Sequence, residues 1–233
     1  MLMGMRPFVF VNVAATADGK IDTWERKGAT ISSVLDKERV DRLRAESDAI
    51  MVGGRTLLDE DPKLTVKSEA LRAERVARGL PPNPIKVGVV SQARIRPDSA
   101  FLTAGPARIL IFTTTSTPAD QLERLRARGV DVFVHPGPRV DLSQALATLW
   151  EFGVRRLMVE GGGTLNFELL RLGLVDEWNV YIAPMIFGGA TAPTPAMGSG
   201  LAREQAIPLR LVDSQVHPDG GVVLRYVLPS KSP

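Results

Sequence analysis

One stretch decides the fold: Arg156-Leu157-Met158-Val159-Glu160-Gly161-Gly162-Gly163-Thr164-Leu165. It begins with an apolar run of strand length, passes through three glycines, and enters a segment of helix length that ends near residue 172. A buried strand that leads through a glycine turn into a helix is typical of an α/β protein. The free N–H groups at the start of such a helix also bind anions, so this turn is a candidate phosphate site.

The same alternation extends over the rest of the chain. Further strands are predicted over residues 8–14, 49–52, 86–90, 108–112, 130–134, 180–183, 209–216 and 222–227. Further helices are predicted over residues 33–46, 68–78 and 118–129, and from Asp141 onward. Pro218-Asp219-Gly220-Gly221 joins the last two strands as a hairpin. The sequence therefore predicts an α/β fold with a mostly parallel sheet and a C-terminal antiparallel hairpin, in a single domain over residues 1–233.

The composition excludes several classes of protein. The 233 residues include no cysteine and two histidines, which excludes disulfides, thiol catalysis, iron–sulfur clusters and cysteine-ligated zinc, and we predict no metal site. The net charge is only +3 and the charges are interspersed, so nothing indicates nucleic-acid binding. No segment approaches the ~20 apolar residues that span a bilayer, and no signal-peptide h-region with a cleavage site appears. We therefore expect a cytoplasmic protein that does not contact membranes.

A second glycine turn, Gly53-Gly54-Arg55-Thr56, follows the strand predicted over residues 49–52. Two such turns in one domain suit the pyrophosphate of a dinucleotide. The planar guanidinium of Arg55 suits a further phosphate, such as the 2′-phosphate of NADP. The alternative is that these glycines only permit tight turns. Neither turn has the G-x-G-x-x-G spacing, so a Rossmann fold has no specific support.

Three carboxylates, Asp18, Asp61 and Glu160, end a predicted strand or follow one closely. A carboxylate at such a position can bind ribose hydroxyls or a pyrimidine edge, or act as an acid. The alternative for Asp18 is an ordinary Asp-Gly turn, and the alternative for Glu160 is a surface residue. Because Glu160 lies between a buried strand and a glycine turn, the sequence favours a functional role for it.

Taken in order, these motifs resemble the riboflavin-biosynthesis reductase family. This is the reductase domain that bacteria fuse to a pyrimidine deaminase and that archaea and fungi use alone. The resemblance covers about residues 7–190. Its motifs are Val11-Asn12-Val13-Ala14, Asp18-Gly19-Lys20-Ile21, Leu43-Arg44-Ala45, Asp48-Ala49-Ile50, Gly53 with Thr56, Asp61-Pro62, Leu64-Thr65-Val66 and Glu160-Gly161-Gly162 with Leu165.

The resemblance implies the three-layer sandwich fold of dihydrofolate reductase and an NADPH-dependent reaction. The implied substrate is a small phosphorylated pyrimidine, a 6-ribosylamino-pyrimidinone 5′-phosphate. Its ribosylamine opens to an imine or iminium at C1′, and hydride transfer from NADPH leaves a ribitylamino product. The family also implies a homodimer.

Matched position by position, the resemblance places the site residues. Cofactor contacts fall on Ala14, Thr30, Thr56, Glu60, Ser91, Gly162, Gly163, Thr164, Leu165 and Asn166, to which the residue pattern itself adds Arg55. Substrate contacts fall on Gly28, Arg44, Asp61, Leu64, Lys67 and Glu160. The predicted catalytic residues are Asp61, Glu160 and Asp18. The chain departs from the family pattern at Thr16-Ala17, Thr30 and Glu60, which bears on the nicotinamide and ribose contacts.

Whether the reduction comes before or after the deamination of the pyrimidine is predicted from what the sequence lacks. A deaminase partner would need an H-x-E and P-C-x-x-C zinc site, and this chain has no cysteine. A stand-alone reductase resembles the archaeal and fungal enzymes, which reduce the 2,5-diamino compound before deamination. Three alternatives remain open: reduction of the deaminated 5-amino-uracil compound, a dihydrofolate-type reductase, and a catalytically silent NADP-binding module.

Overall fold

A computed structural model describes residues 5–229, and the chain divides into two compact units. The first unit contains residues 5–8 and Asp41–Met158, and the second contains Val9–Val40 and residues 159–229. Neither unit is a continuous stretch, because the chain passes from one to the other after Phe8, after Val40 and after Met158. The single domain over residues 1–233 therefore stays a prediction.

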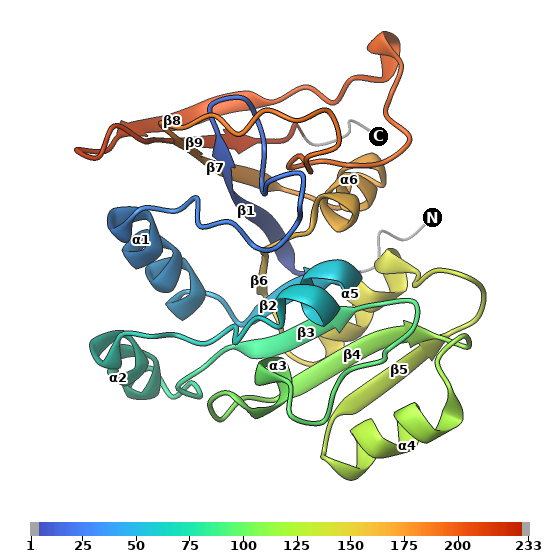
Figure 1. The fold of residues 1–233 in the computed structure, drawn as a ribbon. Helices are drawn as coiled ribbons and strands as arrows, with labels where there is room; N and C mark the ends of the chain where they lie inside the picture. Colours follow the sequence, from blue (N-terminus) through green and yellow to red (C-terminus); the bar gives the residue numbers. More distant parts are fainter. Residues whose placement is uncertain (1–4, 230–233) are drawn as a thin grey trace. The chain divides into compact units, whose positions relative to one another are not determined.

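The first unit contains a sheet of strands in the order β5-β4-β3-β2-β6 (Figure 1). These strands are β2 (Ala49–Gly53), β3 (Ile85–Val89), β4 (Ile109–Thr114), β5 (Asp131–His135) and β6 (Arg156–Val159). The pairs β2–β3, β3–β4 and β4–β5 are parallel. Every residue of β2 and β4 is buried, which is why these strands are continuous apolar runs in the sequence.

The helices of the first unit are α2 (Glu69–Ala77), α3 (Ala100–Thr103), α4 (Ala119–Ala127) and α5 (Leu142–Glu151). Side chains cap two of them at the predicted helix starts: Ser68 accepts from Leu71 N, and Asp141 accepts from Gln144 N. The one-turn helix α3 and a π-helix over Thr56–Glu60 were not predicted, because neither carries an apolar repeat.

The second unit contains strands in the order β1-β7-β9-β8. They are β1 (Phe8–Thr16), β7 (Glu177–Ala183), β8 (Arg210–Val216) and β9 (Val222–Val227). The pair β1–β7 is parallel, whereas β7–β9 and β8–β9 are antiparallel. The predicted hairpin closes through His217 N, which donates to Gly221 O at 2.8 Å.

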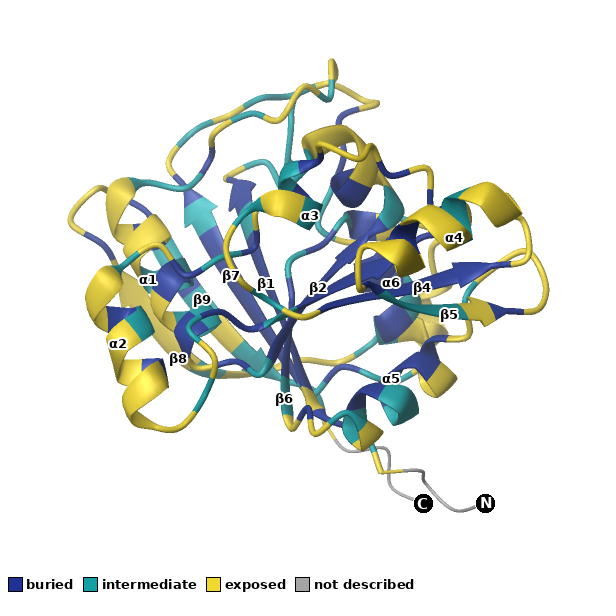
Figure 2. Cartoon of the chain, turned by 90° about the horizontal axis from the view of Figure 1, so that it is seen from below, coloured by how far each residue is buried: buried dark blue, intermediate teal, exposed yellow. Residues whose placement is uncertain are grey.

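The second unit also contains α6 (Gly163–Arg171) and a short 3₁₀ turn over Arg203–Gln205, and α1 (Val34–Ala45) runs from the second unit into the first. One apolar cluster of this unit is formed by Ile31, Tyr181, Ala183 and Val223, and Ala14 packs against it. Most strands are largely buried, whereas β8 is exposed, and the helices expose one side, as Figure 2 shows for α2 and α4.

The predicted fold class, an α/β fold with a mostly parallel sheet and a C-terminal antiparallel hairpin, is confirmed.

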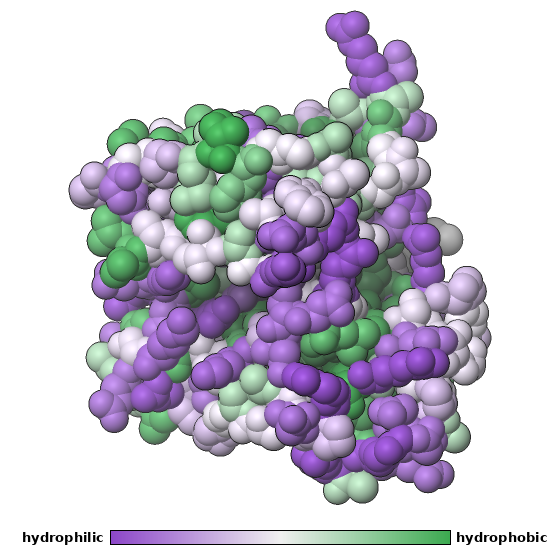
Figure 3. Space-filling model, viewed as in Figure 1, coloured by the Kyte–Doolittle hydropathy of each residue, from purple (hydrophilic) through white to green (hydrophobic). Residues whose placement is uncertain are grey.

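Hydrophilic and hydrophobic residues are interspersed on the face drawn in Figure 3. Among residues 5–229, no helix combines the length and apolar character that crossing a membrane requires. The same residues contain no group of three His, Cys, Asp or Glu side chains placed to hold a metal ion.

Candidate functional site

The three-glycine turn of the second unit presents backbone donors at the start of α6. Gly161 has φ +104°, a conformation that favours glycine, and the extended Gly162 is the N-cap of α6. Asn166 N donates to Gly162 O at 3.1 Å and thereby makes the first hydrogen bond of the helix. By helix geometry, the N–H groups of Gly163, Thr164 and Leu165 point out of the helix end, where an anion can accept from them.

Gly163 is required for a different reason than Gly161. A Cβ added at Gly163 would lie 2.3 Å from the backbone oxygen of Thr194, far inside contact distance. Met197 N donates to Gly163 O at 2.9 Å, and the fully buried Asn166 donates from Nδ2 to Pro195 O at 2.9 Å. Residues 194–197 therefore pack directly on the start of α6.

Asp18 fastens one loop of the second unit to another. Its carboxylate accepts from Thr16 Oγ1 at 2.5 Å, from Gly188 N at 2.7 Å and from Phe187 N at 3.2 Å. The hydrogen bond from Thr16 lowers the pKa of Asp18 below its ordinary value; partial burial opposes this, and the two N–H groups add to it. A carboxylate held in the charged form is a weak proton donor near neutral pH, so these contacts favour an anchoring role.

The remaining predicted residues of the second unit lie on β1, on the loop after it and after β6. Ala14 is half-buried on β1, and Thr30 is exposed. Gly28 has φ +83°, and its N–H donates to Asp22 Oδ2 at 2.9 Å. The other Asp22 oxygen accepts from Ala29 N at 2.9 Å, so Asp22, which the sequence reasoning missed, closes this loop. Glu160 is half-buried and directly precedes the glycine turn.

In the first unit, the second glycine turn leads into the π-helix. Arg55 is exposed at its N-cap, and the buried Thr56 donates from Oγ1 to Glu60 Oε1 at 3.1 Å. Ser91 is exposed just after β3. A Cβ added at Gly54 would lie 3.1 Å from a methyl group of Val90, so the turns after β2 and β3 are adjacent. Arg55 and Ser91 thus follow the carboxyl ends of neighbouring parallel strands.

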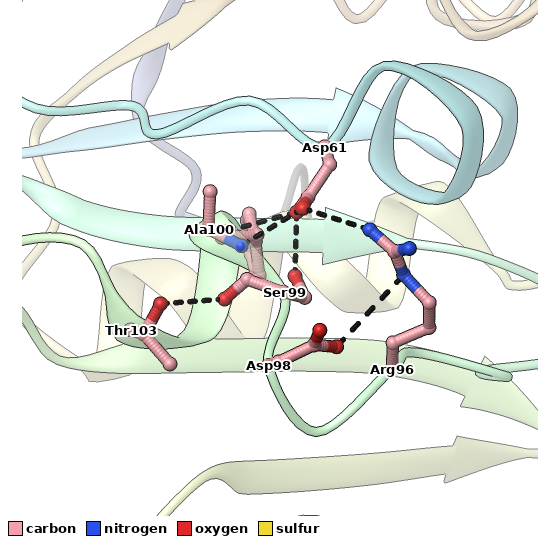
Figure 4. Close-up of polar contacts among 7 residues, drawn as sticks. Asp61, Arg96, Asp98, Ser99, Ala100 and Thr103 are labelled. Carbon is pink, nitrogen blue, oxygen red and sulfur yellow. Dashed lines mark hydrogen bonds and ion pairs between the residues drawn. The ribbon is translucent and has the colours of Figure 1, made fainter.

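Asp61 binds the N-terminus of α3 (Figure 4). One carboxylate oxygen accepts from Ser99 Oγ at 2.6 Å and from Phe101 N at 3.0 Å. The other accepts from Ala100 N at 2.9 Å and lies 3.5 Å from Arg96 Nη2. Partial burial on its own raises the pKa of Asp61, but these hydrogen bonds and the charge of Arg96 outweigh it and leave that pKa below its ordinary value. The catalytic role of Asp61 stays a prediction.

Lys86 holds the opposite end of α3. This β3 lysine is completely buried, and its Nζ donates to Phe101 O at 3.0 Å and to Ala104 O at 2.5 Å. Burial lowers the pKa of Lys86 to about 8, against the opposing effect of the Asp61 charge. The sequence predicts only a strand at Lys86, and a lysine inside an apolar run is the one signal in the sequence that points to a special role.

Two predicted substrate contacts of the first unit, Arg44 of α1 and Lys67, are linked to the same short segment of the chain, residues 65–68. Arg44 Nη1 donates to Thr65 O at 3.1 Å, and the Lys67 side chain is exposed. The backbone here is fixed by Asp41 of α1, whose carboxylate accepts from Lys67 N at 2.6 Å and from Ser68 N at 2.7 Å. Leu64, three residues before Lys67, is buried.

Comparison with known proteins decides the family. The family described as RibD C-terminal domain matches residues 7–223. The chain belongs to this family of riboflavin-biosynthesis reductases. It is 46% identical over 200 residues to the 2,5-diamino-6-ribosylamino-4(3H)-pyrimidinone 5′-phosphate reductase of Archaeoglobus fulgidus, covering 86% of this chain and 90% of the relative. It is 44% identical over 207 residues to the protein of the same name from Methanothermobacter thermautotrophicus, covering 89% and 91%.

Solved structures of RibD-type reductases share the fold. A pyrimidine reductase-like protein from Corynebacterium diphtheriae matches with a TM-score of 0.82 at 22% identity, over 95% of this chain and 92% of the other. RibD of Acinetobacter baumannii matches with a TM-score of 0.78 at 23% identity, over 96% of this chain and 58% of the other. The predicted dihydrofolate reductase-like α/β fold of this family is confirmed.

Proposed function

We propose that this RibD-family reductase uses NADPH to reduce the ribosylamino group of 2,5-diamino-6-ribosylamino-4(3H)-pyrimidinone 5′-phosphate to a ribitylamino group. The observation that carries the proposal is the similarity, over about nine-tenths of their lengths, to two reductases named for this substrate. Membership of the family makes the chain an oxidoreductase. Beyond this, we propose that the nucleotide is NADPH and that the pyrimidine is the 2,5-diamino compound.

The start of α6 fits the pyrophosphate of a dinucleotide. Three N–H groups point out of this helix end, and no side chain is attached at Gly161, Gly162 or Gly163. We assign the cofactor to the predicted set Ala14, Thr30, Arg55, Thr56, Glu60, Ser91, Gly162, Gly163, Thr164, Leu165 and Asn166. In the first unit, the exposed guanidinium of Arg55 is suited to a 2′-phosphate, which favours NADPH over NADH.

The cation pair Arg44 and Lys67 supports the assignment of a phosphorylated substrate. Arg44 donates to Thr65 O, two residues before Lys67, and an arginine and a lysine can together bind the oxygens of a phosphate monoester. The Asp41 carboxylate accepts from the backbone N–H groups of Lys67 and Ser68 and so holds this segment in place. We assign the substrate to the predicted residues Gly28, Arg44, Asp61, Leu64, Lys67 and Glu160.

Of the three predicted catalytic carboxylates, Glu160 is the one we place at the reacting group, because it directly precedes the glycine turn to which we assign the cofactor. Asp18 and Asp61 each accept several hydrogen bonds from neighbouring backbone and hydroxyl groups, which suits anchoring. A bound reduced nicotinamide would supply the hydride for ribosyl C1′. The Glu160 side chain would accept from the N–H beside C1′ and stabilise the iminium form, whose nitrogen keeps its proton as the C1′–H bond forms. This step requires no nucleophile from the chain.

We also propose a cytoplasmic homodimer. Strand β8 ends the strand order of the second unit and is almost fully exposed. Leu211 and Val216 on this strand are 49% and 76% exposed. An exposed edge strand with apolar side chains is a common surface for pairing with a second copy. Sedimentation analysis tests this point directly, and a monomer at micromolar concentration would contradict it.

The test of the proposed function is NADPH oxidation with three substrates: the diamino pyrimidine, its deaminated uracil counterpart and dihydrofolate. We expect turnover with the diamino compound and a lower kcat/KM with the uracil. A higher kcat/KM with the uracil would assign the chain to the deaminated substrate, and turnover of dihydrofolate alone would make it a dihydrofolate-type reductase. NADPH binding without any turnover would indicate a silent NADP-binding module.

A further inference from the structure

The segment Asp61–Lys67 connects two sets of residues to which the proposed function assigns ligands. The π-helix Thr56–Glu60 precedes it, and Lys67 ends it. Two of its residues adopt left-handed backbone conformations: Asp61 at φ +48° and Leu64 at φ +46°. Such a conformation is rare for a bulky residue such as leucine and strains the backbone. It persists only where the surroundings hold it.

Helix α3 provides many of the contacts that stabilise the left-handed conformation of Asp61. Three donors at its start, Ser99 Oγ, Ala100 N and Phe101 N, converge on the Asp61 carboxylate. This arrangement, drawn in Figure 4, joins residues that are 38 to 40 positions apart in the sequence. The conformation of the turn therefore depends on where the start of α3 lies.

A helix of one turn cannot fix its own position. Four residues are far too few for a helix that is stable by itself, so α3 needs outside contacts. At its C-terminal end, the buried Lys86 binds the carbonyl oxygens of Phe101 and Ala104. A carboxylate at the N-terminus and an ammonium group at the C-terminus also match the helix dipole. Lys86 is itself on β3, whose residues 86–89 are all buried, so it is a fixed anchor.

We propose that Lys86 is a positioning residue of this reductase: by anchoring α3, it fixes the left-handed turn at Asp61 and so places the ligand-binding residues on either side of that turn. This rests on the proposed function for the identity of the ligands. Lys86 acts through α3 and Asp61 and touches neither cofactor nor substrate. Lys86 then holds Asp61 in place through α3, and this role of Asp61 differs from the catalytic role predicted from its motif.

The test compares Lys86→Met, Ser99→Ala and the double variant with the wild type. Lys86→Met keeps an unbranched side chain that is one atom shorter and removes both hydrogen bonds to α3. Ser99→Ala removes one hydrogen bond to Asp61 and leaves Lys86 in place. The matched control is Arg126→Met, which removes a cation from an exposed position of α4 in the same unit. NADPH affinity is measured by calorimetry, and kcat and KM are measured with the diamino substrate.

We expect Lys86→Met to weaken NADPH binding and to raise the KM of the pyrimidine about tenfold, because small misplacements of binding groups carry large penalties. Ser99→Ala should have a smaller effect of the same kind, and Arg126→Met none. Since both substitutions act through α3, the double variant should lose less affinity than the sum of the two single losses.

Two results would overturn the proposal. One is a lowered melting temperature of Lys86→Met with unchanged NADPH affinity and KM, which would make Lys86 a purely structural residue. The other is strict additivity in the double variant. If Lys86→Met does not fold, an unchanged NADPH affinity in Ser99→Ala would also overturn it. A wild type that binds NADPH but reduces no pyrimidine would end the proposed function, while the NADPH affinities would still decide the role of Lys86.

Discussion

The free energy of unfolding should depend on pH through Lys86, and the substitution Lys86→Met reveals this dependence. The ammonium group is completely buried and makes its hydrogen bonds to two carbonyl oxygens. Its pKa is about 8 in the folded protein, against 10.5 for an unperturbed lysine. The folded chain therefore releases this proton at a lower pH than the unfolded chain does.

Between pH 8 and 10.5 the unfolded state binds more protons at this position, so stability rises with pH in that window. This gain in the free energy of unfolding is complete above pH 10.5, the pKa of Lys86 in the unfolded chain. It is lost as the pH falls to about 8, the pKa of Lys86 in the folded protein. Each pH unit between the two pKa values is worth about 1.36 kcal/mol, so the full change is about 3 kcal/mol.

The assay is urea unfolding of the wild type and Lys86→Met at several pH values from about 7 to about 10. Other groups titrate in both proteins, so their contributions cancel in the difference between the two stabilities. That difference should move in favour of the wild type by about 2–3 kcal/mol across this range. A difference that stays constant, or that moves against the wild type, would refute a buried Lys86 with a lowered pKa.

Three further predictions concern the site. Arg55→Ala should weaken NADPH binding roughly tenfold or more and leave NADH binding almost unchanged, as measured by calorimetry; equal losses would show that Arg55 does not bind the 2′-phosphate. Glu160→Ala should lower kcat roughly a hundredfold with little change in NADPH affinity, and an equal loss of affinity would place Glu160 in the cofactor site. Gly163→Ala should destabilise the fold by about 1–3 kcal/mol in urea unfolding, because its Cβ would lie 2.3 Å from Thr194 O. Wild-type stability of that variant would mean that residues 194–197 move aside freely.

The larger elements could be predicted from the sequence because their signals are local. The strand–glycine–helix stretch at residues 156–171 forms β6, the turn and α6 where the sequence places them. The caps Ser68 and Asp141 likewise act within four residues of their own position. In contrast, α3 depends on Asp61 and Lys86, which lie more than ten residues away in the chain, and no local pattern indicates it.

The sequence also predicts candidate residues for the site, but not the contacts that these residues make. Ordered motifs identify Arg44 and Lys67 as candidates, whereas Asp41, which holds the backbone of Lys67, lies 26 residues away from it. Asp22 and Lys86 were missed for the same reason: each acts by binding backbone groups whose position only the fold determines. Such contacts carry no fixed spacing in the sequence.

The most direct test of the central claim follows the hydride itself. The enzyme is incubated with the 2,5-diamino substrate and NADPH that carries deuterium at the transferred position of the nicotinamide, and the pyrimidine product is examined by mass spectrometry and NMR. The account predicts a ribitylamino product with one deuterium, bound to C1′. A product without deuterium at C1′, or deuterium anywhere else in the molecule, would contradict it.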